Sequence, residues 1–463
     1  MKDFLLDIVK DEPGFVELRH HENTTNNIMA QKGRVDQAST STQTGVGVRV
    51  LYNGAWGFSS TSIVEKQSIK KAITMARDAA KEISKSKKNK IPDLNRVELA
   101  KVDYKDKDFD ALKSKAIEDK ISHVVETEKK LVKLSEKIHT AVVRYSEIFE
   151  SKAIVTTDGA FCMRSLVRPE FRASAYAGHG DNQQVAGRGV GVSGGWNCLF
   201  QHQSCEHIVE ETAREAVDLL SARHADGGKK TVILSPSLVG LLCHEAIGHT
   251  VEADFVMAGS VAQGKIGQRV GSDLVTLCDS GTPPYAGGPG GFLPFDDEGV
   301  PCHTTTIIEK GILKNYLHNR ESAQHFQVQP MGNARAWAYS DEPLIRMTNT
   351  YLLPGHLTLE EMIQSTKDGL LIVGAGGGQA DATGEFMFGA SCAYEIKNGK
   401  KGRMLKEVTL SGMAFDVLGS VNAVSKEFMW DLGSGYCGKG QPAKVDAGGP
   451  YIRCQLTVGG RQD

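Results

Sequence analysis

The 463-residue sequence has no long apolar run and no apolar leader at its N-terminus. Its longest apolar runs, such as Leu370 to Val373, are the size of a strand, whereas a membrane-spanning helix needs about 20 apolar residues. Charged residues interrupt the first segment every few positions, so it lacks the continuous apolar core of a secretory signal peptide. We therefore expect a soluble protein that neither crosses a membrane nor is secreted.

An excess of charge and a paired cysteine motif are also missing. The chain has 54 lysines and arginines and 56 aspartates and glutamates, so its formal net charge is only -2 and no nucleic-acid binding is expected. The nine cysteines are an odd number, lie between Cys162 and Cys454 and form no Cys-x-x-Cys pair. This excludes a disulfide framework and a zinc ribbon, and reduced cysteines without a targeting signal predict a cytoplasmic location.

The first part of the chain predicts a β-hairpin followed by a helix. In residues 45–57, glycine-valine alternation leads into Asn53-Gly54, which is a type I′ turn signal, and then into a second strand. Apolar residues from 69 to 83 then fall at helical spacing behind Ser68, which we expect to be the N-cap.

The same order of patterns returns further along the chain. A long amphipathic helix is predicted at 109–137. Residues 187–196 then repeat the glycine-valine alternation, and a second helical pattern follows behind Ser204. We interpret the two regions as a degenerate duplication of one hairpin-plus-helix unit.

These patterns predict an α+β fold with four parts. Residues 1–90 form an N-terminal α+β domain, and the polar residues 91–108 form a linker. Residues 109–227 form a second α+β domain that repeats the first. Residues 228–463 form a β-rich catalytic domain that carries a metal-binding helix.

The strongest chemical signal is the segment His244-Glu-Ala-Ile-Gly-His249. Ser235-Pro236 follows a predicted strand and supplies a capping hydroxyl and a first-turn proline, so a helix should begin there and continue through the motif. Zinc peptidases place two histidines four residues apart, about 40° around the helix axis, with a general-base glutamate between them. Here the spacing is five.

In a regular helix, a spacing of five would leave the two imidazoles about 140° apart and unable to share one ion at about 2.1 Å. A π-bulge of one residue would return both rings to one face of the helix. We predict a widened turn at Ile247-Gly248, because glycine is the residue least constrained in its backbone.

Two histidines do not complete a catalytic zinc site, which takes three protein ligands and leaves the fourth position to water. Glu252 could reach back as a ligand or orient the ring of His249. Cys437 is the other candidate, because the glycines around it let a loop approach closely and a zinc-bound thiol ionises readily. Glu245 lies on a mostly apolar helix, where a carboxylate is costly without a partner such as a metal-bound water.

The motif resembles the TldD branch of the TldD/PmbA metallopeptidases, which are also called modulators of DNA gyrase. The resemblance extends over nearly the whole chain and is most specific in four segments, residues 244–254, 295–299, 346–350 and 436–440. The loop after Cys437 is one residue shorter than the family pattern.

This resemblance implies that His244, His249 and Cys437 bind Zn2+ and that Glu245 is the general base on a zinc-bound water. Glu252 then supports the ligands without being one. Arg346, Asn349 and the backbone amides of residues 374–378 are candidates for binding the substrate and stabilising an oxyanion.

The resemblance also implies hydrolysis of unfolded or short peptides. It implies a dimer, formed either with a PmbA-type chain that lacks the histidine motif or with a second copy of this chain. The alternative is a non-catalytic peptide-binding or regulatory protein of the gyrase-modulator type with structural zinc. A purely structural zinc site would have four protein ligands and would not need Glu245.

Overall fold

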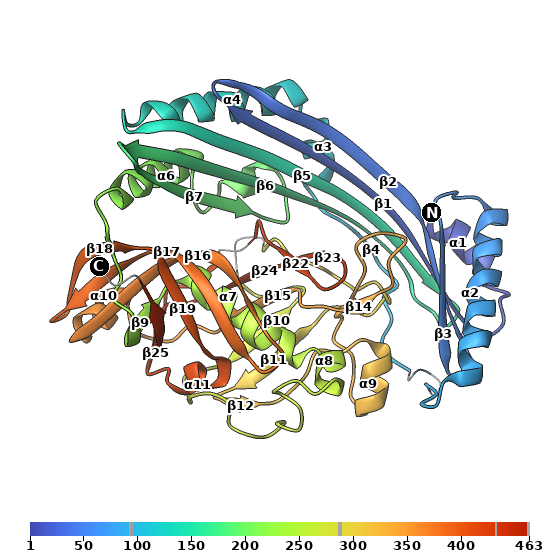
Figure 1. Ribbon diagram of the computed structural model, residues 1–463. Coiled ribbons are helices and arrows are strands. Elements are labelled where there is room, and N and C mark those ends of the chain that lie inside the picture. Colours follow the sequence, from blue (N-terminus) through green and yellow to red (C-terminus); the bar gives the residue numbers. More distant parts are fainter. Residues whose placement is uncertain (92–93, 95, 286–288, 431–432, 461–463) are drawn as a thin grey trace.

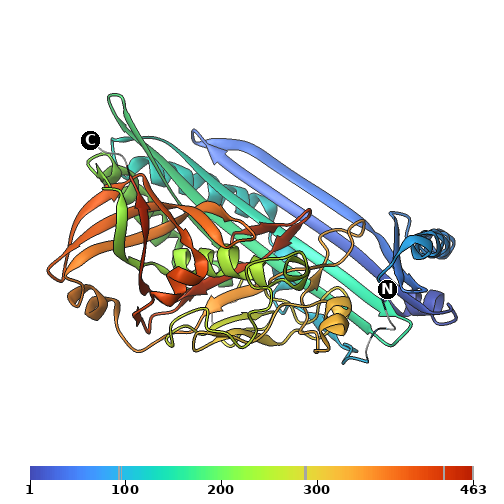
Figure 2. The same ribbon diagram turned by 60° about the horizontal axis from the view of Figure 1, so that its bottom comes forward.

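The computed structural model describes residues 1–91, 94, 96–285, 289–430 and 433–460 (Figure 1). A long curved sheet from the N-terminal half arches over the β-rich C-terminal half (Figure 1). The N-terminal helices lie at one end of the long strands in both views (Figure 1 and Figure 2). In the described part of the chain, no helix has both the length and the apolar character needed to cross a membrane.

The curved sheet has seven strands in the order β3-β2-β1-β5-β6-β4, and β7 pairs with β6. Its long central strands pair antiparallel, and β1 and β5 are in register over 15 residue pairs from Glu17↔Thr156 to Gln31↔Val142. The bounds of the strands are β1 (Phe15–Gln31), β2 (Arg34–Tyr52), β3 (Ala55–Thr61), β4 (Asp103–Lys105), β5 (Ile138–Thr156), β6 (Phe161–His179) and β7 (Asn182–Gly191).

The first predicted hairpin is confirmed. Strands β2 and β3 meet at Asn53 and Gly54, whose φ values of 46° and 77° are those of a type I′ turn. Helix α2 (Lys66–Ser86) packs on this hairpin so closely that a Cβ on Gly57 would lie 1.9 Å from the carbonyl oxygen of Ala76. The predicted N-cap Ser68 is wrong, because the extended backbone that precedes the helix ends at Glu65 and Ser68 already lies inside the first turn.

The second region differs from its prediction in one helix. Helix α6 (Cys205–Leu219) begins behind Ser204 as predicted, and the Ser204 hydroxyl accepts a hydrogen bond from the amide of His207 at 3.1 Å. The single helix expected at 109–137 is instead two helices, α3 (Phe109–Ser114) and α4 (Ile117–Lys133). The chain breaks between them because α3 packs against Phe149 in a separate small core, while α4 packs in the larger core that it shares with α6.

Both N-terminal regions therefore contribute to one continuous sheet, since β1 of the first region pairs directly with β5 of the second. Strand β4 lies inside the segment predicted as a linker and pairs parallel with β6. Residues 92–93 and 95 of that segment lie outside the described residues. The mixed helix and strand composition agrees with the predicted class, and the descent of the two regions from one duplicated unit stays a prediction.

The C-terminal half contains an eight-stranded sheet and a six-stranded sheet. The eight-stranded sheet consists of β16 (Asp368–Ala380), β9 (Gly228–Leu234), β25 (Ile452–Gly459), β19 (Val408–Met413), β17 (Glu385–Lys397), β18 (Lys400–Lys406), β8 (Arg223–His224) and β20 (Ala423–Val424). The six-stranded sheet consists of β12 (Ile312–Leu313), β11 (Thr304–Glu309), β10 (Leu277–Ser280), β15 (Asn349–Leu352), β24 (Asp446–Gly449) and β21 (Met429–Trp430).

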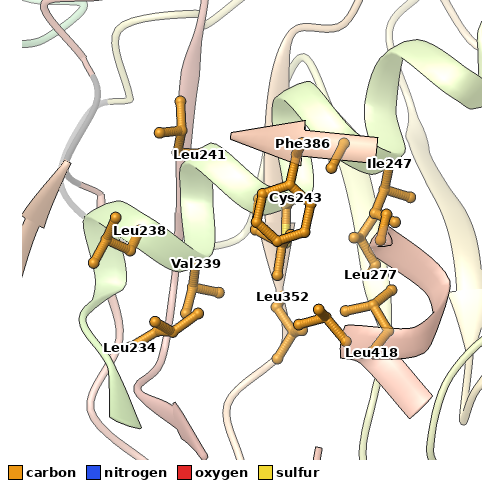
Figure 3. Packing of buried hydrophobic residues seen from close by; sticks show 14 of the residues in the cluster. Leu234, Leu238, Val239, Leu241, Cys243, Ile247, Leu277, Leu352, Phe386 and Leu418 are labelled. Carbon is orange, nitrogen blue, oxygen red and sulfur yellow. The ribbon is translucent and has the colours of Figure 1, made fainter. Parts of the chain in front are cut away.

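A buried helical segment, residues 236–248, packs between these two sheets. Figure 3 shows its apolar side chains facing Leu277 and Leu352 of the six-stranded sheet on one side and Phe386 of β17 on another. Leu418 of helix α11 (Ala414–Gly419) closes the same core. This segment contains the histidine motif, so the motif is embedded in the largest core of the protein.

The cysteines behave as predicted. All nine are free, and all except Cys198 are buried.

Candidate metal centre

The helix that carries the motif changes its winding before the first histidine. Helix α7 (Pro236–Leu241) begins directly after Ser235 and continues without interruption into a π-helical turn, η1 (Leu242–Gly248). The amide of His249 donates to the carbonyl oxygen of His244, five residues back. The predicted widening is confirmed, and it begins earlier than expected, at Leu242.

The wider turn brings the two imidazoles to the same side of the helix, with ring centroids 5.3 Å apart. The side chain of Ser235 does not cap the helix as predicted. Its hydroxyl instead contacts the hydroxyl of Ser237 at 3.1 Å and accepts a hydrogen bond from the amide of Gly374 at 3.2 Å, which ties the start of the helix to β16.

The structural reason for a glycine at position 248 differs from the one predicted. The backbone of Gly248 is ordinary right-handed helix, with φ -55° and ψ -50°, so the conformational freedom of glycine is not used. A Cβ at this position would lie 1.9 Å from the sulfur of Met347. Glycine is required here because Met347 occupies the space of a side chain.

The structure brings the three predicted ligands together. The ligand atoms of His244, His249 and Cys437 all lie within 4.8 Å of one another. The Cys437 sulfur is 3.2 Å from Nε2 of His249, close to the roughly 3.5 Å expected between sulfur and nitrogen ligands of one tetrahedral zinc ion. Both ring nitrogens of His244 are buried and make no hydrogen bond to any described residue.

These observations fit a metal ion. A buried imidazole with neither nitrogen satisfied is costly, and a metal would satisfy one of them. Two nitrogen donors and one sulfur donor are the set that zinc prefers, and three protein ligands leave a fourth position open, as in catalytic zinc sites.

Glu245 lies beside this cluster. Its Oε2 is 3.7 Å from Nε2 of His249, and its side chain is 26% exposed, whereas His244 is only 4% exposed. The carboxylate is therefore the most accessible group of the motif.

Glu252 supports His249 and lies outside the ligand cluster. Its Oε2 is 2.9 Å from Nδ1 of His249, which leaves Nε2 of that ring directed towards Cys437. A carboxylate on the second nitrogen of a ligating histidine orients the ring and increases its basicity. Of the two roles left open for Glu252 by the sequence, the geometry favours this one.

Lys439 lies at the site and was not singled out from the sequence. Its ammonium group donates to Oε2 of Glu252 at 3.1 Å, to Oδ1 of Asp254 at 2.8 Å and to the carbonyl oxygen of Ile345 at 3.0 Å. The available signal was its place in the glycine-flanked segment only two residues after Cys437. The same loop thus supplies one ligand and supports another.

The charges and hydrogen bonds around the ligand cluster favour a negatively charged Cys437 beside a positively charged His249. Burial alone would raise the pKa of the Cys437 thiol, but the charges of His244 and His249, with the hydrogen bond to His249, lower it to about 4. Burial would lower the pKa of His249, but Cys437 and Glu252 raise it to about 10. Burial opposes ionisation of Glu252, yet His249 and Lys439 hold its pKa below its usual value. Both pKa shifts favour the thiolate form of Cys437, which is the form that binds metal.

Arg346 and Asn349, the two substrate-binding candidates, are both buried. Arg346 donates to the carbonyl oxygens of Cys437 and Gln441, so it holds the loop that carries the thiol ligand. The side-chain amide of Asn349 donates to the backbone carbonyl oxygen of Ser280 and accepts from the backbone amide of Gly291. A substrate-binding role for either residue stays a prediction.

Two histidines and a carboxylate on a buried helix, together with a cysteine from strand β22, form a cluster of the kind that holds a metal ion in metallopeptidases. Family comparison agrees along the chain. Residues 16–80 match PmbA/TldA metallopeptidase domain 1, residues 110–220 match the central domain and residues 227–460 match the C-terminal domain. The chain belongs to the PmbA/TldD family of metallopeptidases.

Relatives along the full length agree with this assignment. The chain is 36% identical over 455 residues to a metalloprotease of Methanocaldococcus jannaschii, covering 96% of each chain. It is 32% identical over 446 residues to a metalloprotease TldD homologue of Buchnera aphidicola, covering 93% of this chain and 89% of the relative. A relative from Saccharolobus solfataricus, 28% identical over 461 residues and covering 96% of each chain, is named a zinc metalloprotease TldD homologue.

Solved structures share the fold. A Thermotoga maritima protein named for modulation of a DNA gyrase superposes with a TM-score of 0.79 at 23% identity and covers 99% of both chains. TldE from Thermococcus kodakarensis superposes with a TM-score of 0.77 at 17% identity and covers 98% of both chains. At these identities the likeness shows the fold alone.

Proposed function

We propose that this metallopeptidase is zinc-dependent, that His244, His249 and Cys437 hold the ion, and that Glu245 is the general base. The observation that supports this most is the convergence of the three ligand atoms within 4.8 Å around a buried histidine whose ring nitrogens have no partner among the described residues. Zinc is favoured over harder cations because a thiolate and two imidazoles are soft or borderline ligands.

The proposed chemistry divides the work between the ion and the protein. Bound zinc would supply Lewis acidity to a water molecule and to the carbonyl of the scissile peptide bond. Glu245 takes the proton from the attacking water and later gives it to the leaving amine. Glu252 keeps the ring of His249 in place throughout, and Lys439 keeps Glu252 ionised.

We further propose that the substrates are unfolded or short peptides and that the working enzyme is a dimer, formed with a PmbA-type chain or with a second copy of this chain. Both proposals rest on the family resemblance. Native mass spectrometry of the purified chain, alone and mixed with a PmbA-type protein of the same source, measures the assembly directly.

The substitution Glu245→Gln tests the general base. The amide keeps the size of the carboxylate but cannot accept a proton, so kcat should fall by about 10²–10⁴-fold while zinc stays stoichiometric. Cleavage of a peptide library, followed by mass spectrometry, measures the activity, and metal analysis measures the zinc. Glu210→Gln, on the exposed surface of α6, is the matched control and should behave as wild type.

Two outcomes would contradict the proposal. A Glu245→Gln variant that binds zinc and cleaves peptides as wild type does would remove Glu245 from the chemistry. A zinc-loaded wild type that cleaves nothing, even with its partner, would favour the non-catalytic peptide-binding alternative.

A further inference from the structure

A small cavity of about 10 Å³ lies where the curved sheet meets the C-terminal half. One wall is formed by Lys152 of β5 with Arg164 and Arg168 of β6. Residues 335–337 and 442–444 of the C-terminal half also line the cavity. Residues 442–444 are strand β23 (Pro442–Lys444), which pairs with β22 (Tyr436–Gly438), the strand that carries Cys437.

Positive charge predominates around this cavity. Its lining contains two carboxylates, Glu150 and Asp297, and a third carboxylate, Glu170, binds the ammonium group of Lys444 from behind. The charge of a fourth carboxylate, Asp446, also acts on Lys444, so the five lining cations outnumber the carboxylates by one, and every one of the five is at most 7% exposed. They are Lys152, Arg164, Arg168, Arg335 and Lys444.

Two of the guanidinium groups are incompletely compensated. Arg335 donates to the carbonyl oxygens of Met347 and Lys444, and no carboxylate of the described residues lies within ion-pair distance of it. Arg168 reaches Glu150 only at 3.7 Å and donates to the carbonyl oxygen of Phe292 at 3.2 Å. Its Nε is buried and has no hydrogen-bond partner among the described residues.

The titration behaviour of the cavity agrees with a positive local field. Burial, together with the charges of Arg168 and Arg346, lowers the pKa of Arg335 to about 10 against the opposing charges of Asp297 and Glu150. Burial lowers the pKa of Lys152 to about 8, and its neighbours Arg164 and Arg19 act in the same direction against Asp297 and Glu150. Buried charge of this kind destabilises the folded state unless a counter-ion is present.

We infer that this cavity binds one compact monovalent anion, such as chloride, between Arg168, Arg335 and Lys152. A volume of about 10 Å³ accommodates one small occupant, so we restrict the inference to a single compact ion. A water molecule would fill the space but leave the charge uncompensated.

The position of the cavity gives the anion a consequence for the enzyme. Ala443 lines the cavity and is the strand partner of Cys437, while Lys152 and the two arginines of β6 belong to the curved sheet. A bound anion therefore joins the N-terminal sheet to the hairpin that carries the thiol ligand. Chloride should stabilise the folded protein by mass action because the unfolded chain has no such site.

Thermal unfolding of the zinc-loaded, full-length protein tests this inference. Sodium chloride and sodium gluconate are compared at equal ionic strength, because gluconate supplies the same screening but is too large for the cavity. We expect Tm to rise by about 2 °C more in about 0.3 M chloride than in gluconate. Equal Tm values in the two salts would overturn the inference.

Two variants of β6 make the test specific. Arg168→Met removes a cavity cation and should abolish the chloride-specific rise, whereas Arg172→Met, exposed on the same strand, should keep it. Chloride that bound at the zinc would act equally in both variants. Retention of the rise in Arg168→Met would therefore contradict the proposed site.

A crystal of the wild-type protein soaked in bromide gives a second readout that does not depend on a variant folding. The expected result is an anomalous peak in the cavity between Arg168 and Arg335. Density for water without an anomalous signal would overturn the inference.

Discussion

The two segments that supply the metal ligands are held in place by different forces. The helix of residues 236–248 is buried along its whole length except at Glu245, and it is fixed by apolar packing between two sheets. The loop that carries Cys437 is a short hairpin whose alternate residues are exposed. It is fixed by hydrogen bonds and ion pairs from Arg346 and Lys439.

This difference separates two kinds of effect. A change in the helix disturbs the largest core of the protein, so it should alter stability first. A change in the loop leaves that core intact, so it should alter metal binding first. The following substitutions test this distinction, from the largest expected effect to the smallest.

Cys437→Ala should remove the metal without unfolding the protein. Two imidazoles alone hold zinc poorly, so the variant should lose stoichiometric zinc on dialysis and lose peptidase activity with it. Its Tm should match that of the metal-free wild type. Cys454→Ala, a buried cysteine on β25 outside the site, is the control and should retain zinc. A Cys437→Ala variant with full zinc would remove the thiol from the ligand set.

Gly248→Ala should destabilise the fold. The new methyl group would lie 1.9 Å from the sulfur of Met347, and relief of such overpacking typically costs about 1–3 kcal/mol. Denaturant unfolding of the metal-free protein measures the free energy of unfolding. Because the clash is with a single side chain, the added substitution Met347→Ala should cost less in the Gly248→Ala background than in the wild type. Independent, additive effects of the two substitutions would contradict this reason for the glycine.

Lys439→Met should weaken zinc binding while leaving stability nearly unchanged. Among the described residues, loss of the ammonium group leaves Glu252 with His249 as its only side-chain partner, and loss of such supporting groups typically costs about 10–100-fold in metal affinity. Competition with a chromogenic chelator measures that affinity. The exposed Lys426→Met is the matched control. Unchanged affinity in Lys439→Met would show that the loop supports the site through Cys437 alone.

Local structure could be predicted from the sequence because its causes lie close together along the chain. The residue pattern alone predicts the turn at Asn53-Gly54, the N-cap at Ser204 and the free state of the cysteines. The widened helix was predicted from the five-residue histidine spacing alone, since the geometry of a helix determines where two rings can meet.

The errors arise where packing overrides a local pattern. The continuous apolar pattern of residues 109–137 predicts one helix, but two separate cores divide it into α3 and α4. Gly248 was expected to supply backbone freedom, and the space taken by Met347 is the actual reason for it. Neither the two cores nor the contact of Gly248 with Met347 can be identified from residue spacing along the chain.

The sequence by itself determined the histidine motif, the general-base candidate and the distortion that lets both rings face one ion. Residue pattern and spacing left Cys437 and Glu252 open as the third ligand, and only the resemblance to a family selected the thiol. The tertiary structure decided which atoms meet, because Cys437 is 188 residues from His249 and only packing brings the two together. The tertiary structure also decided where positive charge gathers, since the lysines and arginines that line the small cavity come from strands and loops that are distant along the chain.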